Sequence, residues 1–447
     1  MSFKFTNKLV LLFILTLTGV ITIDSNYINF FSYTNKELST PLKILFFVTF
    51  SILFSVFAAI LLKNIKSYYM KSNQTQLKHK NLVQYIALAS QFLVISFLAV
   101  EIFQMGFLNM YNSNLTLLAL FASFVPSILF MVLLVLLLIG WFGSSKSFMI
   151  MAYAISFSII CIYLIVSSIY IYNQFTYTSE WIKPRSLHST LVNTFLSYLS
   201  TSFGAALDML SLLSFVLVWI ATVTLLRQYR IRIGRNKYWI TIIIPLIYFL
   251  FPFERYISDF TEQWLSESPV IFTIIYIFLF SATKQVGGLL FSIVFLTAST
   301  KIKQTTLQNS LKITAIGVAI VFSCLEINSI LYATYPPYGI VSIMLMPLGS
   351  YSLFIGLLMS ARLISQDKKL RLELFQSSEN QLAFLKTIGK VQMEKEIEKN
   401  LKSILKRGLI IEVSKDDYED QENVSELVQE VIKELRFKTS EINKSEK

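Results

Sequence analysis

The chain has 447 residues, of which 54% are hydrophobic and 15% are charged. Soluble proteins carry about 25% charged residues, so this composition excludes a water-soluble globular protein and a disordered one. The net charge is +12, and the basic excess lies in residues 1–364, which carry 23 Lys and Arg against 10 Asp and Glu. We therefore expect an all-α, polytopic membrane protein with a charged tail.

Ten stretches before the tail approach the length of about 20 apolar residues that a membrane-spanning helix needs. They are Leu9–Ile23, Pro41–Leu62, Leu82–Gln104, Leu115–Phe142, Phe148–Tyr172, Phe203–Leu226, Tyr238–Phe253, Val270–Ala298, Ile313–Tyr332 and Ile340–Ser365. The first is short and follows Lys4 and Lys8, so a signal peptide is its alternative, although no A-x-A-like cleavage site follows Val20. We predict a transmembrane helical bundle of about ten helices over residues 1–365.

The basic residues beside these stretches predict the orientation of the bundle. If the N-terminus is cytoplasmic, the cytoplasmic segments before the tail carry 17 Lys and Arg and no acidic residue. The outer segments then carry 5 basic and 7 acidic residues. Because Lys and Arg favour the cytoplasmic side, we expect a multi-pass protein of the cell membrane with both termini in the cytoplasm.

Four ionisable residues fall inside the predicted spans: Glu101, Asp208, Lys284 and Glu326. Each costs about 2.5–3.5 kcal/mol to insert, so each needs a partner or water. We predict a buried pair of Lys284 with Glu326 or Asp208, which either fixes helix packing or forms a ligand or proton site open to the outside. Gly287 and Gly288 follow Lys284 by one turn and predict either close approach of another helix or a hinge.

The sequence offers no catalytic or metal-binding pattern. Cys161 and Cys324 both lie in apolar stretches, so we expect buried thiols and no disulfide. The two histidines, His79 and His188, are far apart, and the tail has neither a histidine to accept phosphate nor a P-loop. We expect no enzymatic activity, metal, cofactor or nucleic-acid partner.

From Gln366 the chain becomes charged and helix-favouring. Apolar residues that recur mostly every three or four positions predict a cytoplasmic amphipathic helix over 366–408, continuous with the last span. Residues 409–447 are expected to form an acidic linker and a short C-terminal helix. A coiled coil is one alternative for the tail, so residues 366–435 are candidates for self-association or for binding a cytoplasmic protein.

Four segments stand out in the C-terminal third. They are Lys284–Gly288 (KQVGG), Tyr335–Gly339 (YPPYG), Ser365–Arg371 (SQDKKLR) and Gly389–Glu398 (GKVQMEKEIE). In these segments the chain resembles a group of uncharacterised archaeal multi-pass membrane proteins. The resemblance implies a shared architecture and no known activity, so it assigns no functional residues.

Our leading hypothesis is a sensor or receptor-like membrane protein. A site facing outward or lying within the membrane would bias the bundle, and the last span would pass this change to the cytoplasmic tail. One alternative is a secondary transporter or ion pathway that uses Lys284, Asp208 and Glu326. Another is a structural subunit of a membrane complex. The lipid bilayer is the expected partner in all three cases.

Overall fold

The computed structural model of the chain describes residues 7–33, 39–71, 80–176, 180–183, 194–226, 235–236, 238–239, 242–243, 246, 283–325, 335–376 and 382–412. Nearly all of these residues are helical, which confirms the all-α class. The elements are α1 Asn7–Tyr33, α2 Thr40–Lys71, α3 Lys80–Leu108, β1 Tyr111–Asn112, α4 Ser113–Ser145, α5 Phe148–Thr176, β2 Trp181–Ile182, α6 Thr194–Leu226, α11 Thr283–Thr300, α12 Thr305–Ser323, α13 Ile340–Met344, α14 Met346–Gln366, α15 Lys368–Gln376 and α16 Ala383–Glu412.

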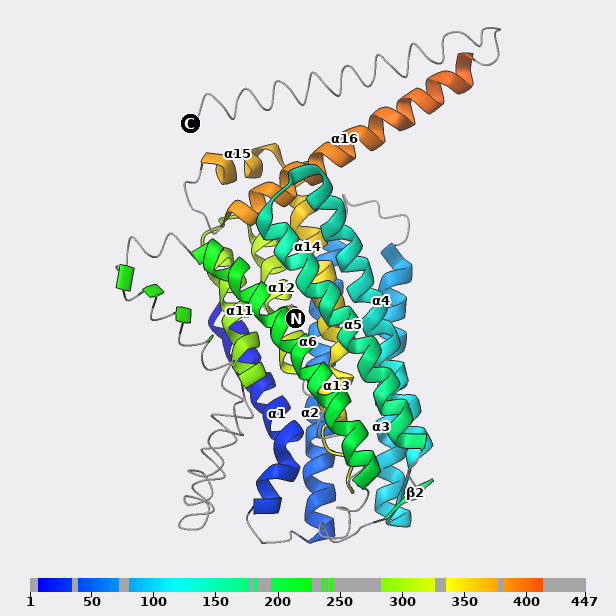
Figure 1. Cartoon of the computed structure of the whole chain (residues 1–447). Coiled ribbons are helices and arrows are strands. Elements are labelled where there is room, and N and C mark those ends of the chain that lie inside the picture. Colours follow the sequence, from blue (N-terminus) through cyan, green and yellow to red (C-terminus); the bar gives the residue numbers. More distant parts are fainter. Residues whose placement is uncertain are drawn as a thin grey trace.

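The long helices lie side by side in one bundle (Figure 1). Helices α15 and α16 lie at one end, which we call the tail end. At the other end, which we call the strand end, β1 pairs with β2 in a two-residue antiparallel ladder that joins Tyr111 to Ile182 and Asn112 to Trp181. This ladder ties the α3–α4 turn to the chain that follows α5.

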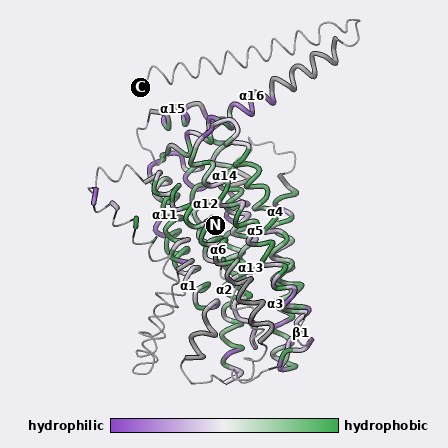
Figure 2. Tube along the Cα trace, in the orientation of Figure 1, coloured by the Kyte–Doolittle hydropathy of each residue, from purple (hydrophilic) through white to green (hydrophobic). Residues whose placement is uncertain are grey.

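Seven helical stretches of the described residues are long and apolar enough to cross a membrane. They are Asn7–Ser25, Thr40–Ser67, Leu82–Leu108, Ser113–Ser145, Phe148–Asn173, Thr305–Ser323 and Ile340–Gln366. Two shorter apolar helical stretches, Met209–Thr224 and Gln285–Thr300, fall in the predicted spans Phe203–Leu226 and Val270–Ala298. The predicted span Tyr238–Phe253 lies for the most part outside the described residues, so a total of ten stays a prediction. Figure 2 shows the apolar character of the bundle and the polar character of α15.

Helix α14 lies inside the bundle and is covered on all sides. Every residue from Ile340 to Ala361 is buried. The neighbouring helices instead turn large apolar side chains outward, for example Leu45, Phe92 and Val125. Because a helix that is apolar all round belongs in an interior, α14 is the central element around which the other helices pack.

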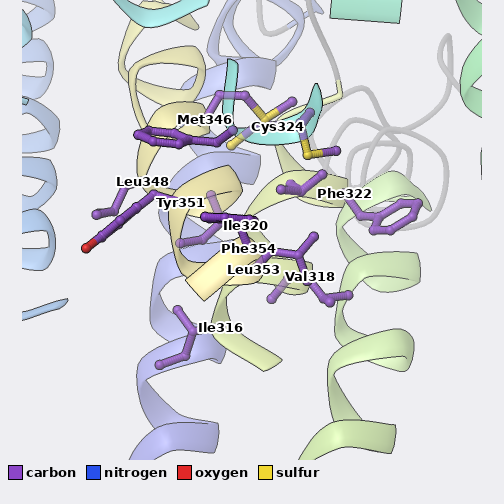
Figure 3. Packing of buried hydrophobic residues seen from close by; sticks show 14 of the residues in the cluster. Ile316, Val318, Ile320, Phe322, Cys324, Met346, Leu348, Tyr351, Leu353 and Phe354 are labelled. Carbon is purple, nitrogen blue, oxygen red and sulfur yellow. The ribbon is translucent and has the colours of Figure 1, made fainter. Parts of the chain in front are cut away.

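Small residues let α12 and α14 approach closely, and Figure 3 shows the apolar side chains that interleave around their contact. A Cβ added at Gly317 of α12 would lie 2.8 Å from the Cα of Leu353, and one added at Gly356 of α14 would lie 2.7 Å from the backbone N of Thr314. Contacts of this kind are typical of helices that pack inside membranes.

Two differences between the predicted spans and the observed helices concern the last part of the bundle. The span Ile340–Ser365 is divided at Leu345 into α13 and α14, with Pro347 in the first turn of α14. Proline lacks the N–H that a continuous helix would need there. Helix α12 begins eight residues before the predicted start, at Thr305, so Lys312 is buried inside a helix and does not lie in a loop as predicted.

The tail also differs from the single helix predicted over 366–408. The chain leaves the helical conformation at Asp367, whose φ and ψ are −95° and 103°. The Asp367 carboxylate accepts the N–H of Leu370 at 3.0 Å, which caps a new helix, α15, and it also accepts the Gln304 side chain at 3.1 Å. A capping aspartate favours this break over a helix interior. Helix α16 then begins at Ala383 and continues past the predicted end at Gly408.

Candidate functional site

A buried carboxylate at the strand-end half of the bundle holds the divided last span. Asp24 of α1 is 0% exposed, and its Oδ2 accepts hydrogen bonds from the backbone N and the hydroxyl of Ser342, at 2.9 and 2.7 Å. Ser342 is the third residue of α13, where free helical N–H groups favour a negative charge. The predicted span Leu9–Ile23 ends one residue before Asp24, which places Asp24 in an outer segment. Helix α1 in fact runs on to Tyr33, which places this residue inside it.

Other polar side chains satisfy the backbone groups around the break in the last span. The Ser123 hydroxyl of α4 donates to the carbonyl of Ile343 at 2.8 Å, and the Tyr163 hydroxyl of α5 donates to the carbonyl of Leu325. Non-helical backbone is tolerated inside a membrane protein only where such partners are supplied. Helices α1 and α4 therefore bind α13 itself, and α5 binds the chain just after the end of α12.

Glu101, a predicted site residue, lies on the buried face of α3 and is 0% exposed. Thr116 of α4 lies beside this carboxylate, but the Thr116 hydroxyl donates to the carbonyl of Asn112 at 3.3 Å. By geometry, neither carboxylate oxygen of Glu101 therefore has a hydrogen-bond partner among the described residues. It shares its helix face with Gln91, whose side-chain N and O are likewise buried and unsatisfied, and the hydroxyl of Ser350 in α14 is a further such group. A buried polar group without a partner costs about 1–3 kcal/mol. These side chains therefore lower the stability of the bundle.

Two tyrosines flank Glu101 at the strand end. The rings of Tyr111 and Tyr335 stack with centroids 6.1 Å apart, and the Tyr335 hydroxyl donates to the carbonyl of Met105, one turn beyond Glu101, at 3.2 Å. Burial, with a further contribution from the nearby Glu101 carboxylate, raises the pKa of Tyr111 well above its ordinary value. Glu101 therefore lies buried beside Tyr111 of β1 and Thr116 of α4, and it is not exposed to solvent.

The other predicted site residues lie at positions where the side chain is not described. Asp208 lies in α6 and Lys284 in α11, whereas Glu326 falls outside the described residues. Helices α6 and α11 do pack together, with the rings of Phe215 and Phe291 4.9 Å apart. The pairing of Lys284 with either acid thus stays a prediction.

Gly287 and Gly288 lie at the contacts of α11 with its neighbours. Gly287 faces the ring of Phe215 in α6, and a Cβ at Gly288 would lie 2.9 Å from the carbonyl O of Ala319 in α12. Both positions are inside the continuous helix α11. A side chain at Gly288 would therefore meet the backbone of α12, whereas one at Gly287 would have to displace the Phe215 ring.

At the tail end, the first half of α16 docks on the bundle. The Phe384 ring packs against Tyr153 of α5, with centroids 5.3 Å apart. The indole N–H of Trp141 in α4 donates to Gln392 Oε1 at 3.2 Å, and the hydroxyl of Ser365 in α14 donates to Glu396 Oε2 at 3.0 Å. Some of the apolar residues that predicted an amphipathic helix therefore pack against the bundle of the same chain.

The polar groups described above either form hydrogen bonds with one another or are buried without a partner. Within the part of the chain that the structure describes, no three His, Cys, Asp or Glu side chains are placed to hold a metal ion. Cys161 and Cys324 are buried free thiols, as predicted. No family model, curated protein or solved structure matches the chain. The resemblance of its C-terminal third to archaeal membrane proteins stays a prediction.

Proposed function

We propose that the chain is a sensor or receptor-like membrane protein, which relays a change at the strand end of its bundle to α15 and α16 at the tail end. The observation that carries this proposal is the position of α14. Through α13 it is tied to Asp24 on the strand-end side, and at its other end Ile364 and Ser365 contact α16. A shift of this central helix would change both contacts together.

In this proposal the strand end faces outward and the tail end lies in the cytoplasm. Exposed Lys146, Lys301 and Lys303 lie in turns at the tail end, and exposed Lys63 lies in the last third of α2, toward the same end. The exposed Glu180 lies at the strand end. The positive-inside preference supports this orientation.

The input of the proposed relay is the charge state of Glu101. An ionised carboxylate without a partner is costly in a membrane interior, so its neutral or cation-bound form is favoured there. Gain or loss of a proton or another cation would alter the packing of Tyr111 and Tyr335. Because Tyr335 precedes α13 by only five residues, this change would reach the segment that positions α14.

Hydrogen exchange tests the relay in the full chain reconstituted into nanodiscs. Glu101→Gln fixes the side chain in a neutral form, and we expect it to alter the exchange rates of the amides of residues 383–396 in α16. The control is Glu180→Gln, which removes an exposed carboxylate at the same end and should leave these rates unchanged. Identical exchange in the wild-type protein and in both variants contradicts the proposal.

A secondary transporter is the second candidate, and a different observation favours it. Transporters often bind substrate at helices interrupted within the membrane, and here α13 and α14 are separated next to Asp24, while Gln91 and Ser350 carry unsatisfied polar atoms. Vesicles loaded with a pH-sensitive dye test proton movement through the reconstituted protein. Proton flux that disappears in Lys284→Ala would support transport and contradict a pure receptor.

A further inference from the structure

Helix α16 has two halves with different surroundings. In the first half, Phe384, Leu385, Ile388 and Val391 are buried and face the bundle. The second half runs past the edge of the bundle (Figure 1). Successive residues of a helix are rotated by about 100°, so the bundle-facing side continues into the second half as a row of lysines. This row consists of Lys395, Lys399, Lys402 and Lys406.

The opposite side of the second half carries an apolar row. It consists of Ile397, Leu401, Ile404 and Gly408, at spacings of four, three and four residues. This is the spacing of a coiled-coil seam. Ile397 is 42% exposed, which agrees with a row that faces away from the bundle. The spacing therefore predicts a continuous apolar side on the second half of α16, and we expect a further segment to cover it.

The C-terminal segment of the same chain carries a matching row. Val424, Val428, Val431 and Leu435 also recur at spacings of four, three and four residues. If the two segments run antiparallel, one register aligns both rows. When Gly408 lies opposite Val424, Ile404 lies opposite Val428. The same register places the remaining two residues of each row opposite one another: Leu401 opposite Val431, and Ile397 opposite Leu435.

The length and charge of the chain favour this intramolecular arrangement. Helix α16 ends at Glu412, which leaves residues 413–423 to reverse the chain, and helix–helix connections of about 2–8 residues already suffice in bundles. Residues 399–407 carry four basic and no acidic side chains, whereas residues 416–434 carry eight acidic and one basic. Opposite net charges steer the two segments together.

We propose that residues 424–435 form a helix that packs antiparallel on residues 397–408 of α16, so that the tail ends in a helical hairpin projecting from the bundle. The occupant of the apolar row is thus the chain's own C-terminal segment, in place of a second copy or another protein. The hairpin stands independently of the signalling proposal, since it rests on α16 and the sequence after it.

Thiol cross-linking in the full-length protein tests this register. In the double variant Leu401→Cys with Val431→Cys, we expect a short bis-maleimide to join the two residues within one chain, as identified by peptide mass spectrometry. The control pair, Leu401→Cys with Val424→Cys, is displaced by two helical turns and should give several-fold less product. Equal yields from both pairs, or products that join two chains, overturn the proposal.

Charge substitutions give a second, independent measurement. In the cross-linking background, Ile404→Glu places a carboxylate inside the seam and should abolish the intramolecular product. The matched control, Ser403→Glu, adds the same charge at the preceding residue, which lies outside the seam. This variant should still give the intramolecular product. Loss of the product in both variants, or in neither, contradicts the proposed packing.

Discussion

Oδ2 of Asp24 lies 2.9 Å from the backbone N of Ser342, and this hydrogen bond joins residues 318 positions apart in the chain. It connects the first helix to the last span at the point where that span is divided. Since both residues are buried, this bond is screened very little by solvent. We expect it to contribute measurably to the stability of the bundle.

Asp24→Ala tests this contribution. The variant removes the acceptor of two hydrogen bonds and leaves the buried Ser342 groups to find other partners, so we expect a loss of about 1–3 kcal/mol. Thermal unfolding in detergent measures it as a lower Tm. Asp24→Asn keeps one acceptor oxygen and should lose less. An unchanged Tm in Asp24→Ala would show that the bond contributes nothing.

Gly317→Ala tests the close contact of α12 and α14. The added Cβ would lie 2.8 Å from the Cα of Leu353, so the two helices must separate, and overpacking of this kind costs about 1–3 kcal/mol. The control is Gly143→Ala in α4, where a Cβ meets no atom within 4 Å. We expect a lower Tm for the first variant and an equal or higher Tm for the second. Equal Tm values for both would contradict the contact.

Phe384→Ala tests the docking of α16. Truncating a buried Phe costs about 3–5 kcal/mol, which is enough to detach the first turns of this surface helix. We therefore expect faster amide exchange over residues 383–396 with little change inside the bundle. Lys399→Ala, at an exposed position of the same helix outside the apolar row, should not have this effect. Unaltered exchange in Phe384→Ala means that the ring does not anchor α16.

Thiol labelling in intact cells tests the orientation. Lys303→Cys, in the exposed α11–α12 turn, should resist a membrane-impermeant reagent, whereas Lys183→Cys at the strand end should react. Background labelling should be low, because Cys161 and Cys324 are buried. Reaction of the Lys303→Cys variant from outside would reverse the proposed topology.

A double-mutant cycle tests the predicted pairing of Lys284. If Lys284 pairs with Glu326, Lys284→Met alone and Glu326→Gln alone each leave an unpaired charge and should cost about 3–5 kcal/mol, while the double variant recovers much of this loss. The same cycle with Asp208→Asn asks whether that acid is the partner. Additive losses of Tm with both acids would show that neither one pairs with Lys284.

The apolar stretches of the sequence predicted the helices well, because burial in a bilayer demands long apolar runs whatever the tertiary contacts are. The ends of the helices were less predictable from the apolar stretches. Lys312 looks like a loop residue by charge, but α12 begins at Thr305 and the packing of this helix in the bundle buries the residue. Asp24 looked like an outer residue because it follows an apolar stretch, and only its contact with Ser342 explains why it is buried.

The tail was harder to predict for a similar reason. Local periodicity favoured one helix through Asp367. The hydrogen bond from the Leu370 N–H to the Asp367 carboxylate, which begins a new helix instead, leaves no mark in the apolar periodicity. The docking of Phe384 on Tyr153 joins residues more than 200 positions apart. Glu101 was identified from sequence as an intramembrane charge, yet its burial beside Tyr111 and Thr116 follows only from the three-dimensional arrangement.

The central place of α14 has a consequence for biosynthesis. This helix lies near the C-terminal end of the membrane part of the chain, so it leaves the ribosome after α1–α6, α11 and α12. Those helices must therefore enter the bilayer before the element that they surround is present. The finished bundle cannot close around its axis until translation has passed residue 366, and until then the polar groups that meet α13, among them Asp24, must be accommodated by lipid, water or the insertion machinery.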